Sequence, residues 1–94
     1  MTGYIIAQIE VTDPEKFKEY QELAKGTADP FGGDFIVRGG NMEVMEGESL
    51  SRVVIIKFPS FQNAKDWYNS PGYSKAKEVR QIAAQSNFII VEGQ

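Results

Sequence analysis

The sequence has neither cysteine nor histidine among its 94 residues. Without cysteine the chain has no disulfide framework and no thiolate nucleophile. Without histidine it lacks the most common general base in proteins, the usual zinc ligand and the proximal ligand of most haem proteins. No cluster of closely spaced carboxylates takes their place, so we expect no metal site and no cofactor.

Positive charge and long apolar runs are also scarce. The chain has 10 basic and 13 acidic residues and a formal net charge of −3, so nothing predicts binding to nucleic acid or to an anionic membrane. The N-terminal segment lacks the charged leader of a secretory signal, and no apolar run is long enough to span a bilayer. We therefore expect a soluble cytoplasmic protein, folded as a single domain over residues 1–94.

Hydrophobic periodicity predicts strands and helices in a definite order. Residues 4–11 alternate as a strand, and a helix follows within residues 12–25, where Asp13 suits the N-cap and Pro14 the first helical position. After a turn rich in glycine and proline, residues 34–47 are predicted to form a second strand. The pair Gly39-Gly40 indicates a bulge or bend in its middle.

The second half of the chain completes the pattern. A short turn leads to a third strand at residues 51–58, which favours a β-hairpin. Ser60 then caps a helix, and Ser70-Pro71 repeats the capping pattern, so this helix is expected to break in two. With a last strand at residues 87–93, the order is β-α-β-β-α-β. This order predicts an α+β, ferredoxin-like fold with a four-stranded antiparallel sheet and helices on one face.

The third and fourth strands have apolar residues on both faces, so both faces need to be covered. Two helical segments can cover one face only. The simplest cover for the other face is the same face of a second copy, which predicts a homodimer that pairs sheet to sheet.

Four segments together resemble the bacterial domain of unknown function 1330 family: "GYIIAQIEVTDPEKFKEY", "PFGGDFIVRGG", "KFPSFQNAKDWYNSPGYSKAKEVR" and "FIIVEG". The resemblance implies membership of the dimeric α/β-barrel superfamily, in which two ferredoxin-like subunits face their sheets together. That superfamily includes cofactor-free monooxygenases of aromatic polyketides, muconolactone isomerases and haem-binding proteins. The absence of histidine argues against the haem-binding type, and a shared fold does not transfer a function.

Aromatic residues supply the candidates for a ligand pocket. Trp67, Tyr68 and Tyr73 lie close together in the sequence and could wall an apolar pocket that offers a hydroxyl or an indole N–H. Tyr4 and Tyr20 are further candidates. The alternative is that Trp67 fills the core while the tyrosines lie half-buried at a subunit rim.

Arg38 is the candidate catalytic residue. Its parity in the strand is opposite to that of Phe35 and Val37, and its guanidinium could hold a carboxylate or stabilise an enolate. The alternative is an ion pair with Asp34, with Glu43 or with the other subunit. Ser70 has no histidine to activate it and is explained as a helix cap.

Two functions are compatible with these residues. The first is a cofactor-independent enzyme, similar to a monooxygenase or an isomerase, that acts on a small organic acid or aromatic substrate. The second is a dimer without catalytic activity that binds a small ligand or stabilises a partner.

Overall fold

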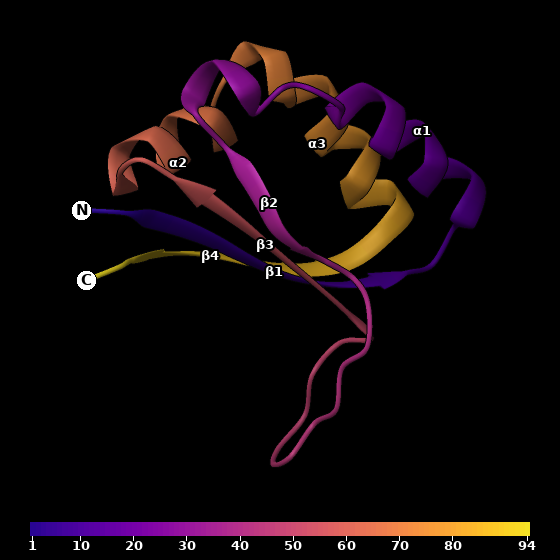
Figure 1. Cartoon of the computed structure of the whole chain (residues 1–94). Helices are drawn as coiled ribbons and strands as arrows, with labels where there is room; N and C mark the ends of the chain where they lie inside the picture. Colours follow the sequence, from indigo (N-terminus) through magenta and orange to yellow (C-terminus); the bar gives the residue numbers. More distant parts are fainter.

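Four antiparallel strands form one sheet, and the helices cover only one of its faces (Figure 1). The computed structural model describes all 94 residues. The elements are β1 (Gly3–Val11), α1 (Pro14–Ala24), a 3-10 turn (Asp29–Phe31), β2 (Asp34–Arg38), β3 (Arg52–Phe58), α2 (Phe61–Tyr68), α3 (Pro71–Ala83) and β4 (Ala84–Glu92). The strand order is β2-β3-β1-β4. This arrangement confirms the predicted ferredoxin-like α+β fold.

The helices begin where the sequence predicts them to begin. The Asp13 carboxylate accepts a hydrogen bond from the Lys16 backbone N–H at 3.2 Å, and the Ser60 hydroxyl caps α2 in the same way. The hydroxyl of Ser70 accepts from the Tyr73 N–H at 3.3 Å and donates to the Trp67 carbonyl at 2.7 Å. One side chain thus joins the end of α2 to the start of α3. The region predicted as one broken helix is therefore two separate helices, which makes three in all.

The predicted second strand is too long. β2 ends at Arg38, because Gly39 and Gly40 take positive φ angles of 73° and 98° that no regular strand continues through. Residues 39–51 form a long loop rather than a strand and a short turn, and this loop extends beyond the sheet, away from the helices (Figure 1). The antiparallel pairing of β2 with β3 is confirmed. Its irregularity lies between Phe35 and Val37, not at the glycine pair.

Alternation along the strands separates a covered face from an uncovered one. Ile5, Ile9 and Ile56 point toward the helices and are almost completely buried in the core. On the other face Ile6 pairs with both Ile55 and Ile89. We call this second surface the uncovered face, and its apolar residues are Ile6, Val37, Val53, Ile55, Ile89 and Val91. Since nothing within the chain packs on it, Ile89 is 55% exposed.

The first helix packs against α3 more than against the sheet. The ring of Tyr20 from α1 meets the ring of Tyr73 from α3 edge to face, with 6.3 Å between their centroids. Because α1 is held against its neighbouring helix, space is left between α1 and the strands. None of the helices has the length and hydropathy that a bilayer-spanning segment requires.

Candidate functional site

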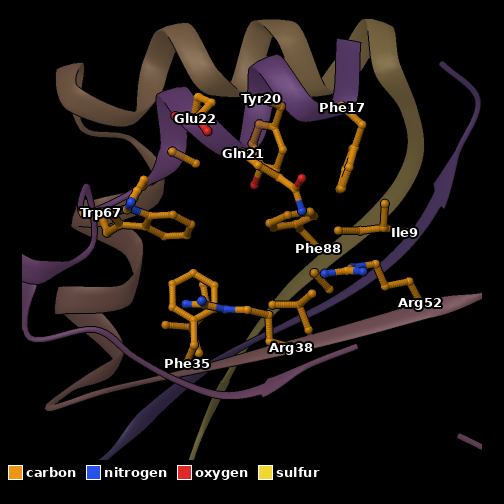
Figure 2. A pocket seen from close by; sticks show the side chains of 16 residues that line it. Ile9, Phe17, Tyr20, Gln21, Glu22, Phe35, Arg38, Arg52, Trp67 and Phe88 are labelled. Atoms are coloured by element: carbon orange, nitrogen blue, oxygen red, sulfur yellow. The ribbon is translucent and has the colours of Figure 1, made fainter. Parts of the chain in front are cut away.

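A cavity of about 300 Å³ fills the space between α1 and the covered face of the sheet (Figure 2). Most of its lining is apolar. Phe17 and Tyr20 line it from α1, and Trp67 lines it from α2. Residues of all four strands form the rest, including Ile9, Phe35, Arg38, Arg52, Val54 and Phe88. Because exposed residues of α1 and of the edge strand β2 are part of the lining, the cavity opens to solvent between these two elements.

Arg38 lies at this cavity because of the irregular pairing of β2. Phe35 pairs with Ile56 and Arg38 pairs with Val54, although strict alternation would place residues three apart on opposite faces. The register shift between Phe35 and Val37 moves Arg38 to the covered face. Its guanidinium carbon lies 4.1 Å from the centroid of the Phe35 ring. The predicted opposite parity of Arg38 and Phe35 is therefore wrong.

A second guanidinium enters the cavity from β3. Arg52 pairs with Ile9 of β1, so it faces the helices, and its Nε is buried without a hydrogen-bond partner. The only salt bridge in the structure joins Lys16 and Glu19 on the surface of α1. Arg38 therefore forms no ion pair with a carboxylate of its own chain. Figure 2 shows both arginines below α1, on the strands that form the floor of the cavity.

The hydroxyls of Tyr20 and Tyr73 form a hydrogen bond of 2.8 Å in the roof of the cavity. Burial raises the pKa of both tyrosines above the ordinary value of 10.0, and the neighbouring Tyr20 hydroxyl raises the pKa of Tyr73 further. Both phenols are consequently neutral at physiological pH. They can donate or accept a hydrogen bond, but they are poor proton acceptors.

Trp67 is part of the core and of the cavity wall at once. Its indole N–H donates to the Thr27 hydroxyl at 3.0 Å, and its ring packs on Tyr73 with 4.1 Å between centroids. The ring is only 2% exposed. Since the N–H already has a partner, Trp67 contributes an apolar surface to the cavity rather than a hydrogen-bond donor.

The structure separates the other predicted aromatic candidates. Tyr73 is fully buried behind Tyr20 and does not line the cavity, so it does not lie at a subunit rim. Tyr68 lines a second cleft, described below. Tyr4 pairs with Lys57 and Val91 and belongs to the opposite side of the sheet. Of the six predicted pocket residues, Tyr20, Arg38 and Trp67 line the main cavity.

The lining residues that were not among the predicted candidates include Phe17, Glu22, Phe35, Arg52 and Phe88. The alternation of side chains along the strands could have predicted two of these residues. Arg52 has the same parity as the buried residues Val54 and Ile56, and Phe88 has the same parity as Ile90. No group of three or more acidic residues is arranged to hold a metal ion.

The fold and this cavity define a ferredoxin-like α+β protein with an arginine-bearing apolar pocket between α1 and the sheet. The family model described as Domain of unknown function (DUF1330) matches residues 2–94. The chain therefore belongs to this family, as its sequence motifs indicated. No curated protein is similar to it by sequence.

Solved structures share the fold at low sequence identity. A protein of unknown function from Rhodopseudomonas palustris is 18% identical with a TM-score of 0.78, and the match covers 99% of this chain and 82% of that one. A dimeric ferredoxin-like protein of unknown function from Jannaschia is 12% identical with a TM-score of 0.75, covering 99% and 100%. SnoaB, a cofactor-independent oxygenase from Streptomyces nogalater, is 13% identical with a TM-score of 0.70, covering 99% and 93%.

The raised pKa values of Tyr20 and Tyr73 predict a loss of stability at alkaline pH. Below pH 10 both phenols are protonated in the folded and in the unfolded chain. Above about pH 10 the unfolded chain loses phenolic protons that the folded chain keeps, so the free energy of unfolding falls as the pH rises. We expect a shallower fall for the double variant Tyr20→Phe/Tyr73→Phe, measured by urea unfolding between pH 8 and 11.

The single variants check the hydrogen bond itself. Tyr73→Phe leaves the Tyr20 hydroxyl without its partner, which should lower the free energy of unfolding by about 1–3 kcal/mol at pH 7. Tyr4→Phe, which removes a hydroxyl from the opposite side of the sheet, is the matched control. If the free energy of unfolding falls equally steeply above about pH 10 in the double variant and in the native protein, the predicted role of the two phenols is wrong.

Proposed function

We propose that the cavity between α1 and the sheet binds a small organic acid with an aromatic or other apolar body. The observation that carries this proposal is the presence of two guanidinium groups without a salt bridge, those of Arg38 and Arg52, in a cavity whose lining is mostly apolar. The Nε of Arg52 is buried without a hydrogen-bond partner, and a carboxylate is the best-matched partner of a guanidinium. The remaining walls are aromatic and aliphatic and suit an apolar body (Figure 2).

The size of the cavity limits the ligand to a small molecule. Its volume of about 300 Å³ is at the lower end of the range of ligand pockets, roughly 300–1,000 Å³. Phe35 extends from the edge strand with Arg38 stacked over its ring. Ligand rings could therefore pack against phenyl groups while the acid group meets a guanidinium.

We further propose that the protein is a cofactor-independent enzyme acting on this acid. A guanidinium that holds a carbonyl or carboxylate oxygen lowers the energy of the enolate formed when the neighbouring carbon loses a proton. Glu22 is the only carboxylate among the lining residues, so it is the candidate base. Returning the proton to another carbon gives an isomerisation without any co-reactant. The fold shared with the cofactor-independent oxygenase SnoaB supports a second possibility, in which molecular oxygen reacts with the enolate.

Binding without catalysis is the second candidate function. It is favoured by Tyr20, the one tyrosine that lines the cavity, because its hydroxyl bonds to the Tyr73 hydroxyl behind it and its raised pKa makes it a poor base. The indole N–H of Trp67 is likewise occupied by Thr27. Binding and catalysis can be separated experimentally, because catalysis needs a base, for which Glu22 is the candidate, and binding does not.

The binding proposal predicts a preference for acids over their neutral amides. Benzoate, phenylacetate and 1-naphthoate should bind more tightly than the corresponding amides in isothermal titration calorimetry. Arg38→Gln and Arg52→Gln should each weaken acid binding about 10–100-fold, since a hydrogen bond to a charged group contributes about 1.5–3 kcal/mol. Amide binding should not change.

Lys75→Gln is the control for these two variants, because it removes one positive charge from the exposed surface of α3. Trp67, the only tryptophan, gives a second measurement through its fluorescence. Equal affinity for acids and amides, or full acid affinity in both arginine variants, would show that the cavity is not an acid-binding site.

Catalysis predicts exchange of a substrate proton with solvent. In D₂O, the protein should speed the loss of the proton signal at the carbon next to the carbonyl of phenylpyruvate, followed by NMR. Glu22→Gln should slow this exchange at least 100-fold while binding is retained, because general acid–base groups contribute about 10²–10⁴-fold. Glu19→Gln, an exposed acid on the same helix, should leave the rate unchanged. Binding without any exchange would favour the non-catalytic function.

Self-association through the uncovered face is also part of the proposed function. Ile6, Ile55 and Ile89 lie side by side on this face, with no cover from their own chain. The loop of residues 39–51 extends beyond the sheet, away from the helices (Figure 1), and its Met45 is 81% exposed. A second copy, facing this one sheet to sheet, would cover the isoleucines and meet the loop. Two structures of similar fold are described as dimeric.

A charge placed in the uncovered face should therefore prevent the dimer. We expect the native protein to have the mass of a dimer in light scattering and Ile89→Glu that of a monomer. Ile82→Glu is the matched control, because Ile82 is 69% exposed on α3 and lies on the helical side. A native protein that is monomeric at high micromolar concentration would contradict the proposed pairing.

A further inference from the structure

A second cleft lies at the other edge of the covered face, between α3 and the first residues of β4. Its volume is about 320 Å³. The residues around it are Tyr68, Arg80, Gln81, Ala84, Ser86 and Phe88. Phe88 also lines the main cavity, so its ring is a wall that the two sites share. The proposed function makes no use of this cleft.

The guanidinium of Arg80 is the unusual group in this cleft. Arg80 is only 3% exposed, yet it forms no salt bridge. Its guanidinium carbon lies 3.9 Å from the centroid of the Phe88 ring, and one terminal nitrogen donates a weak hydrogen bond of 3.5 Å to the Tyr68 hydroxyl. Its Nε is buried without any partner. Since arginine does not lose its proton in proteins, this charge is present at every physiological pH.

Two neighbours strengthen the case for a bound anion. The Ser86 hydroxyl, on another wall of the same cleft, is also buried without a hydrogen-bond partner. Lys77 lies with its ammonium nitrogen 4.4 Å from the centroid of the Tyr68 ring and adds positive charge nearby. Buried polar groups without a hydrogen-bond partner are rare in native proteins, and they destabilise the fold unless a ligand or water supplies the partner. An anion in the cleft would accept hydrogen bonds from Arg80 and Ser86 and would also neutralise the buried charge.

We propose that this cleft is a second binding site, specific for a small carboxylate held by Arg80 and Ser86. A carboxylate has two coplanar acceptor oxygens that match the fork of a guanidinium. It can accept from the Nε–H and from a hydroxyl at the same time. The rings of Tyr68 and Phe88 flank the site and suit a short apolar substituent.

NMR of the arginine side chains tests this proposal directly. The chain has three arginines, so a ¹⁵N-labelled sample gives three Nε–H signals, which Arg38→Gln and Arg80→Lys assign. Titration with sodium acetate should move the Arg80 signal in a saturable way. Acetamide, the neutral isostere, and sodium chloride at the same ionic strength should leave it in place.

Variants then connect the signal to affinity. Ser86→Ala should weaken acetate binding about 10–100-fold, since a hydrogen bond to a charged group contributes about 1.5–3 kcal/mol, and Arg80→Gln should abolish it. Arg38→Gln, which changes only the main cavity, should bind acetate at this site as the native protein does. If Arg80→Gln does not fold, the titration of the native protein and the Ser86→Ala variant decide the question.

Three results would overturn the second site. The first is an Arg80 signal that stays in place up to molar acetate. The second is an equal response to chloride, which would show an adventitious ion only. The third is unchanged acetate affinity in Ser86→Ala together with retained binding in a folded Arg80→Gln. Because this site uses neither Arg38 nor Arg52, its failure would not affect the proposed function of the main cavity.

Discussion

The buried hydrogen bond between the hydroxyls of Tyr20 and Tyr73 joins α1 to α3, and the main cavity depends on that link. Tyr73 packs in turn on Trp67, and Trp67 packs on Phe58 of β3, so a chain of aromatic contacts runs from α1 to the sheet. Helix α1 is thereby held mainly by its contacts with α3 and less by contacts with the sheet. The space between α1 and the sheet remains open, and Phe17 and Tyr20 of α1 form part of its wall.

The positive charges of the arginines lie around cavities rather than in surface ion pairs. Arg38 and Arg52 line the main cavity, Arg80 lines the second cleft, and none of the three has a carboxylate partner. The chain as a whole has a net charge of −3. Positive charge gathered at cavities in a chain of negative net charge supports the proposal that these cavities bind small anions.

Much of the fold was predictable because its signals are local. The caps at Asp13 and Ser70 depend on residues within a few positions, and both were correctly predicted. The second hydrogen bond of Ser70, to the Trp67 carbonyl, was not predicted. Alternation in the strands likewise indicated one covered and one uncovered face. The second strand was predicted too long, because the sequence does not show that Gly39-Gly40 ends the pairing with β3 instead of bending it.

The sequence by itself determined the order of the elements, the break between α2 and α3, and the two apolar faces of the sheet, since each follows from the spacing of neighbouring residues. Only the tertiary structure decided which side chains share a site. The register shift in β2 turned Arg38 toward the helices, and the packing of α3 on the sheet placed Arg80 beside Phe88. Both depend on contacts between segments far apart in the chain, and local periodicity carries no information about such contacts.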